Sequence, residues 1–310
     1  MMNLIYKEDV KPGFHALVVG VSAYSNLPSN NVGGIESMLG LRQLQSTALT
    51  AYRVANWLVE RRAYLHVPLA SCRLLVVPSK AEMAAEPRLA DLVHGCTFDH
   101  FYQAAIEWRR DASSHADNFA LFYFAGHGAQ RSRHSHVMLM QDFGSAGGIF
   151  GKAVETEQLI DGMVPSVDFQ SMALTQLYFI DACRIRPSIL RKYDKPAAGA
   201  LWDPPDFERD DRAVSVFHAA TAGRTAYGRK GEQTGFSAAL LQCLNRDAAE
   251  AEVKPTPGRS GWRVSIHSLA RVLEPNVMRL SAAIKKSAAL PYRTSRNRRH
   301  PALPRRPSNH

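Results

Sequence analysis

Apolar residues follow two patterns along the chain. Short, mostly apolar runs are typical of strands buried on both faces of a parallel sheet. Between them, Ser46–Glu60, Thr97–Arg110 and Gly235–Leu244 repeat apolar residues every three or four positions, which predicts amphipathic helices. This alternation predicts an α/β sandwich with a mostly parallel sheet. The candidate strands are His15–Ala23, Arg73–Val77, Phe119–Ala125, Val137–Met140, Leu177–Asp181 and Val214–Ala220.

Two of these candidate strands end next to a chemically reactive residue. Phe119–Ala125 leads into Gly126-His127-Gly128, and Leu177–Asp181 leads into Ala182-Cys183. Ligands of open parallel sheets bind beyond the carboxyl ends of the strands. We therefore expect the imidazole and the thiol to share one crevice, as nucleophilic catalysis by cysteine requires.

The pair suggests a division of roles. A cysteine thiol titrates near 8.5 and needs a base or cation to become a good nucleophile, which His127 can supply. The backbone amides of Gly128 and Cys183 can stabilise an oxyanion, an effect worth about 3–4 kcal/mol per donor. Alone, a strand-end cysteine is most often a small buried apolar residue and a glycine-flanked histidine a turn residue. Their joint occurrence favours catalysis.

The two motifs resemble those of a known family. Ala125-Gly126-His127-Gly128 and Asp181-Ala182-Cys183, whose histidine and cysteine are 56 residues apart, resemble the histidine and cysteine motifs of the caspase-like cysteine peptidases (peptidase C14), nearest the metacaspase and bacterial caspase-domain branch. The likeness spans about residues 14–245. Flanking segments that support it are His15–Tyr24, Val137–Asp142, Ala219–Arg224 and Gly235–Leu240.

The resemblance implies a fold and an activity. The fold would be a three-layer α/β/α sandwich with six strands in the order 2-1-3-4-5-6, the last one antiparallel. We expect one peptidase domain over residues 1–290, its core at 14–245 followed by a C-terminal extension, and a disordered basic tail at 291–310. The protein would be a cysteine endopeptidase that cuts protein or peptide substrates through an acyl-enzyme, with His127 as base and then acid and Cys183 as nucleophile.

Specificity rests on four candidate pocket residues. In metacaspases the acid two residues before the nucleophile selects Arg or Lys, and Asp181 stands there; a carboxylate pairs well with a guanidinium. Ala125 would line the same pocket. Thr47 replaces a second acid of metacaspases, and the nearby Arg42 would favour Asp if it points inward, as in animal caspases. Cleavage after Arg or Lys is the preferred expectation, and the alternative for Asp181 is a simple strand-end acceptor.

Regulation and partners follow from the same resemblance. No cofactor is expected, and no metal. Calcium activates many metacaspases, but the acidic cluster Asp206, Glu208, Asp210 and Asp211 is better interpreted as a solvated loop, because calcium needs a defined oxygen cage. Relatives act in regulated cell death and antiphage defence, some by cutting gasdermin-like pore formers. The alternative is a catalytically silent caspase-like scaffold that binds partner proteins.

Composition limits the setting. The 310 residues carry a net charge of +10, with an arginine cluster at 293–306 that lacks stacking aromatics, so nucleic-acid binding is not favoured. No apolar run is long enough to span a membrane, and no signal peptide is evident. The four cysteines are scattered, which fits a reducing, cytoplasmic setting. His134-Ser135-His136 lacks further metal ligands and is interpreted as surface histidines.

Overall fold

The computed structural model describes residues 3–28, 40–132, 135–145, 150–184, 198–202, 210–219, 231–251 and 262–288. Its main sheet has the strand order β1-β3-β2-β4-β8-β10. Every pair in this sheet is parallel except β1 with β3. The strands are β1 (Leu4–Lys7), β2 (Phe14–Val21), β3 (Leu69–Val77), β4 (Phe119–Gly126), β8 (Thr175–Ala182) and β10 (Ala213–His218).

A second sheet takes one of the expected strands away from the main one. The run at Val137–Met140 forms β6 (His136–Leu139), which pairs antiparallel with β5 (Gly128–Gln130) and β7 (Phe150–Glu155). The short β9 (Ala198–Gly199) completes this sheet beside β7. Because β5 starts one residue after His127, β6 pairs with it locally and does not join the main sheet.

The expected strand order is therefore wrong in two respects. The other five expected strands keep their relative order, but the last of them, β10, runs parallel to β8. The antiparallel strand is β1, at the opposite edge. A parallel pair needs a connection that returns the chain to the end of the sheet where the first strand begins, and the segment between β8 and β10 is long enough to do so.

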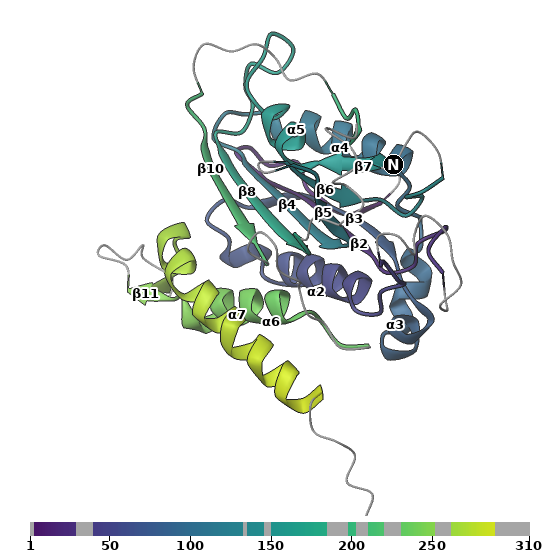
Figure 1. Ribbon diagram of the computed structural model, residues 1–310. Helices are drawn as coiled ribbons and strands as arrows, with labels where there is room; N and C mark the ends of the chain where they lie inside the picture. Colours follow the sequence, from purple (N-terminus) through teal and green to yellow (C-terminus); the bar gives the residue numbers. More distant parts are fainter. Residues whose placement is uncertain are drawn as a thin grey trace, which may run out of the picture.

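Helices cover both faces of the main sheet (Figure 1). On one face lie α2 (Thr47–Glu60), α6 (Gly235–Gln242) and α7 (Ile266–Ala288); on the other lie α4 (Phe98–Ala112) and α5 (Thr156–Asp161). The remaining described elements are α3 (Lys80–Ala85), 3-10 turns at Arg62–Tyr64 and Pro87–Leu92, a π turn at Cys243–Asp247, and the hairpin β11 (Glu250–Ala251) and β12 (Trp262–Arg263).

Alternating residues of the strands supply two apolar cores. In β4, Phe122 and Phe124 belong to the core shared with α4, whereas Leu121, Tyr123 and Ala125 belong to the core shared with α2 and α6. This division explains why the central strands read as continuous apolar runs, since both of their faces are covered. Within the described residues, no helix combines the length and apolar character needed to cross a membrane.

The amino terminus of α2 is bound by a carboxylate from another part of the chain. Ser46 makes no side-chain capping bond. Instead, the buried carboxylate of Glu82 accepts hydrogen bonds from the Leu49 amide (3.0 Å) and the Ser22 hydroxyl (2.9 Å). A carboxylate at a helix amino terminus satisfies unpaired amides and interacts favourably with the helix dipole.

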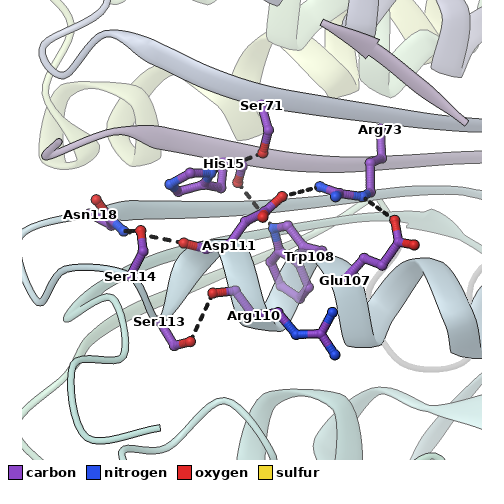
Figure 2. Close-up of polar contacts among 10 residues, drawn as sticks. All are labelled: His15, Ser71, Arg73, Glu107, Trp108, Arg110, Asp111, Ser113, Ser114 and Asn118. Atoms are coloured by element: carbon purple, nitrogen blue, oxygen red, sulfur yellow. Dashed lines mark hydrogen bonds and ion pairs between the residues drawn. The ribbon is translucent and has the colours of Figure 1, made fainter. Parts of the chain in front are cut away.

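A polar cluster attaches α4 to the amino-terminal half of the strands (Figure 2). The guanidinium of Arg73, 3% exposed, pairs with Glu107 (3.2 Å) and with Asp111, both on α4. The Trp108 indole donates to the His15 carbonyl (3.0 Å). These bonds fix the position of α4 beneath the sheet, at the end remote from His127.

Candidate active site

The sheet register places His127 and Cys183 side by side. The parallel pairing of β4 with β8 ends at Ala125 opposite Asp181 and Gly126 opposite Ala182. His127 and Cys183 are the next residues on each strand, at the carboxyl edge of the sheet. A methyl group on Gly128 would lie 2.7 Å from the Cys183 carbonyl oxygen, so the two backbones are in contact. The structure thus brings together the two motifs singled out from the sequence.

The imidazole of His127 has a defined tautomer. Its Nε2 lies 2.6 Å from the carbonyl oxygen of Arg42. Because a carbonyl oxygen only accepts hydrogen bonds, Nε2 carries the proton, and Nδ1 of the neutral ring holds a lone pair. Burial lowers the pKa of His127 to about 4, although the hydrogen bond to the Arg42 carbonyl acts to raise it. At neutral pH, the His127 ring is therefore neutral, and its Nδ1 has a lone pair that can accept a proton.

Tyr24, in the loop that follows β2, contacts this histidine. The Tyr24 hydroxyl accepts the backbone N–H of His127 (2.7 Å), and the two rings lie 4.9 Å apart between centroids. A methyl group on Gly126 would come within 2.9 Å of the same hydroxyl. Because the same methyl group would also lie 2.7 Å from the Phe124 ring, the close approach of both Phe124 and Tyr24 favours glycine at this position. The sequence hypotheses gave no role to Tyr24 or to the Arg42 carbonyl.

The four cysteines lie in different surroundings, and none forms a disulfide. Cys72, Cys96 and Cys243 are fully buried, and burial raises the pKa of each thiol, that of Cys72 to about 12. These three remain protonated at neutral pH and are poor nucleophiles. Cys183 is half-buried at the edge of the sheet, which makes it the most accessible of the four.

Asp181 lies inside the protein and is 2% exposed. Its Oδ2 accepts hydrogen bonds from the Tyr123 hydroxyl (2.9 Å) and from the Thr234 hydroxyl at the start of α6. Its Oδ1 is buried without a hydrogen-bond partner among the described residues. Burial raises the pKa of Asp181 to about 6, although both hydroxyls act in the opposite direction. A carboxylate with one unsatisfied oxygen retains the capacity to accept another donor.

The other three expected pocket residues have different exposures. Ala125 is completely buried in β4. Thr47 is 5% exposed, and its hydroxyl donates to the Val21 carbonyl (2.6 Å). The side chain of Arg42 is exposed. Of these three, only Arg42 offers its side chain to solvent.

Two other sequence interpretations can be compared with the structure. His136 is completely buried, so its interpretation as a surface histidine is wrong; His134 lies outside the described residues. No cluster of three or more potential metal ligands occurs in the part of the chain that the structure describes. Asp210 pairs there with Arg212 (2.7 Å), whereas Asp206, Glu208 and the basic tail fall outside it.

Comparison with known proteins assigns the family. A search of curated proteins finds no match to this sequence. The family model described as "Caspase domain" matches residues 14–256, well over half of the chain. That range contains the main sheet from β2 onward and both reactive motifs. The chain therefore belongs to the caspase-domain family of cysteine peptidases.

Proposed function

We propose that this protein is a cysteine endopeptidase in which Cys183 is the nucleophile and His127 the general base. The observation that carries the proposal is the neutral His127 ring, held by the Arg42 carbonyl with its Nδ1 lone pair available, at the strand end that neighbours Cys183. Such a base activates a thiol that would otherwise stay protonated at neutral pH.

The proposed reaction proceeds in two halves. Nδ1 of His127 takes the proton from the Cys183 thiol, and the sulfur attacks the carbonyl carbon of the substrate peptide. The amides of Gly128 and Cys183 donate to the oxyanion. The imidazolium then protonates the leaving amine as the C–N bond breaks, which leaves a thioester. Water, deprotonated by His127, attacks the thioester; the carboxylic acid leaves and the thiol is regenerated.

We assign the substrate preference to Asp181, and propose cleavage after Arg or Lys. Its carboxylate is ionised above a pKa of about 6, and its Oδ1 has no hydrogen-bond partner among the described residues. A guanidinium or ammonium group supplies the donor and charge that this oxygen lacks. Ala125 and Thr47 would form the apolar and hydroxyl-bearing surroundings of the pocket. The exposed Arg42 is the competing determinant, and would favour Asp.

The activity is tested with peptides that place Arg, Lys or Asp before the scissile bond. We expect turnover of the Arg and Lys peptides by the wild type, and background rates for Cys183→Ala and His127→Ala. Cys243→Ala is the matched control, because it removes a buried thiol outside the site and should retain activity. Absence of turnover of every peptide, with and without calcium, would favour the silent scaffold. Turnover of the Asp peptide alone would move the specificity to Arg42.

The biological role follows the family. We propose protein substrates, with a gasdermin-like pore former as the candidate, and a role in regulated cell death or antiphage defence. Cells that express wild type or Cys183→Ala are compared during phage infection. Protection that needs Cys183 supports the role, and equal protection by both contradicts a proteolytic one.

A further inference from the structure

A second buried histidine contacts the backbone of Cys183. His136, at the start of β6, is completely buried, and its Nε2 lies 3.0 Å from the Cys183 carbonyl oxygen. Because the carbonyl oxygen only accepts, Nε2 carries the proton and donates it. Nδ1 of the same ring lies 3.1 Å from the Thr156 hydroxyl, which therefore donates to it. A chain of hydrogen bonds runs from Thr156 through the His136 ring to Cys183.

The position and protonation of the His136 ring are held from several sides. Its own backbone N–H donates to the Glu157 carboxylate (3.2 Å), and the His218 ring lies edge-on at 5.8 Å. Burial lowers the pKa of His136 to about 4, so that the ring is neutral at physiological pH. A neutral ring has one proton and one lone pair, which matches what its two partners need.

Gly128 provides a separate observation on the same contact. A methyl group at this position would lie 2.6 Å from His136 Nε2 and 2.7 Å from the Cys183 carbonyl oxygen. Both distances are shorter than real contacts of such a group. The absence of a side chain at Gly128 therefore leaves the space through which the bond between His136 and Cys183 passes.

The bond is formed where the support of the sheet ends. The pairing of β8 with β4 extends to Ala182, and its pairing with β10 extends to Ile180. Cys183 follows directly. The hydrogen bond from His136 thus extends the fixation of the β8 backbone one residue beyond its last strand partner.

We propose that His136 is a positioning residue for the nucleophile. Its Nε2–H donates a hydrogen bond to the Cys183 carbonyl and thereby fixes the orientation of the Cys183 side chain relative to β8. This inference rests on the proposed function of Cys183. His136 does not touch the reacting atoms; it acts through the peptide unit that carries the sulfur. Without it, the thiol loses its alignment with Nδ1 of His127, and the reaction slows at an unchanged substrate affinity.

The test compares His136→Leu with His136→Gln. Glutamine keeps an N–H donor within reach of the carbonyl, whereas leucine fills the space without one. Two readouts are measured: the rate at which iodoacetamide alkylates Cys183 between pH 6 and 9, located by mass spectrometry, and kcat and KM on an Arg peptide. We expect His136→Leu to lower both the alkylation rate at pH 7 and kcat about tenfold, with KM nearly unchanged. We expect His136→Gln to restore most of both.

Two further variants keep the test decisive. His15→Leu also removes a buried histidine whose pKa is lowered to about 4 by burial. His15 lies at the start of β2, away from the carboxyl ends of the strands where Cys183 lies, so the rate of Cys183 alkylation should not change. If His136→Leu does not fold, Thr156→Val can be used instead. This variant removes the donor to Nδ1 of His136, and it should also lower the alkylation rate of Cys183. Alkylation at the wild-type rate in the leucine or valine variant overturns the inference, as does an equal loss in the glutamine variant. Because alkylation needs no peptide turnover, a wild type inactive on every peptide would count against the proposed function alone.

Discussion

At the residue scale, hydrogen-bond partners decide the chemistry of the candidate groups. His127 is kept neutral by burial, and its proton is placed on Nε2 by a backbone carbonyl that no side-chain motif reveals. Asp181 is buried among hydroxyl groups, which keep it partly able to ionise. The motif residues are thus only part of the candidate site, and backbone atoms and hydroxyl groups supply the rest.

Asp181 gives a prediction about pH and selectivity. Its pKa is about 6, so the carboxylate is ionised at pH 7.5 and largely protonated at pH 5. We expect the preference for an Arg peptide over a norleucine peptide to rise as pH increases through about 6. In Asp181→Asn the preference should fall about 10- to 100-fold at pH 7.5, the loss expected for a charged hydrogen bond, and lose its pH dependence. A preference in the variant that still titrates near pH 6 would contradict the assignment.

The sequence motifs singled out His127 and Cys183 as candidates because each follows a strongly apolar strand. The motifs gave no role to Tyr24 or His136, because neither residue lies near its partner in the sequence: Tyr24 contacts His127 and His136 contacts Cys183 only through the fold. A buried histidine such as His136 also looks like a surface residue when it stands among Ser and Arg. Only the strand pairing shows which side of β6 it faces.

At the element scale, local patterns identified the elements well and their pairing less well. The helices α2, α4 and α6 lie where the apolar periodicity predicts them. By contrast, β6 was expected in the main sheet, because a buried four-residue run has the same apolar pattern in either sheet. The short β1 was not predicted, since Leu4–Lys7 combines apolar and charged residues.

Arg73 carries a prediction at this scale. It joins β3 to α4 through Glu107 and Asp111, and it is itself buried (Figure 2). We expect Arg73→Ala to lower the free energy of unfolding by about 3 kcal/mol, at the lower end of the cost of breaking a buried ion pair, because both carboxylates keep some contact with water. Urea denaturation measures the change.

The same variant also tests whether the two ends of the sheet are independent. The cluster lies at the end of the strands remote from His127, so the folded fraction of Arg73→Ala should keep its kcat. The control is Arg110→Ala, which removes an exposed arginine of α4, the helix that Arg73 contacts. It should change the free energy of unfolding by less than about 0.5 kcal/mol. Loss of kcat in folded Arg73→Ala would show that α4 also shapes the site.

At the scale of the whole molecule, buried and half-buried histidines make the fold sensitive to acid. His15, His127, His136 and His218 each have a pKa lowered from 6.5 to about 4, mainly by burial. Their unfolded forms bind protons at a higher pH than the folded ones, so they stabilise the fold above pH 6.5 and lose this contribution as pH falls toward 4. Asp181, Glu157 and Asp161, whose pKa values burial raises, act in the opposite direction, but they are three groups against four.

We therefore expect the free energy of unfolding to fall steadily between pH 7 and pH 4.5. Urea denaturation at several pH values measures it, with constant ionic strength as a control for screening. His15→Gln removes one of the four groups away from the candidate site and should make the fall less steep. Stability that is constant or rises over this range would contradict the protonation states assigned to these histidines.

The most direct measurement of the central claim is covalent labelling by a peptidyl acyloxymethyl ketone that ends in Arg. This reagent alkylates a cysteine that an adjacent base activates. We expect one adduct per chain, on Cys183, formed at least tenfold more slowly in His127→Ala. An adduct on Cys72, Cys96 or Cys243, or labelling of Cys183 at the same rate without His127, would contradict it.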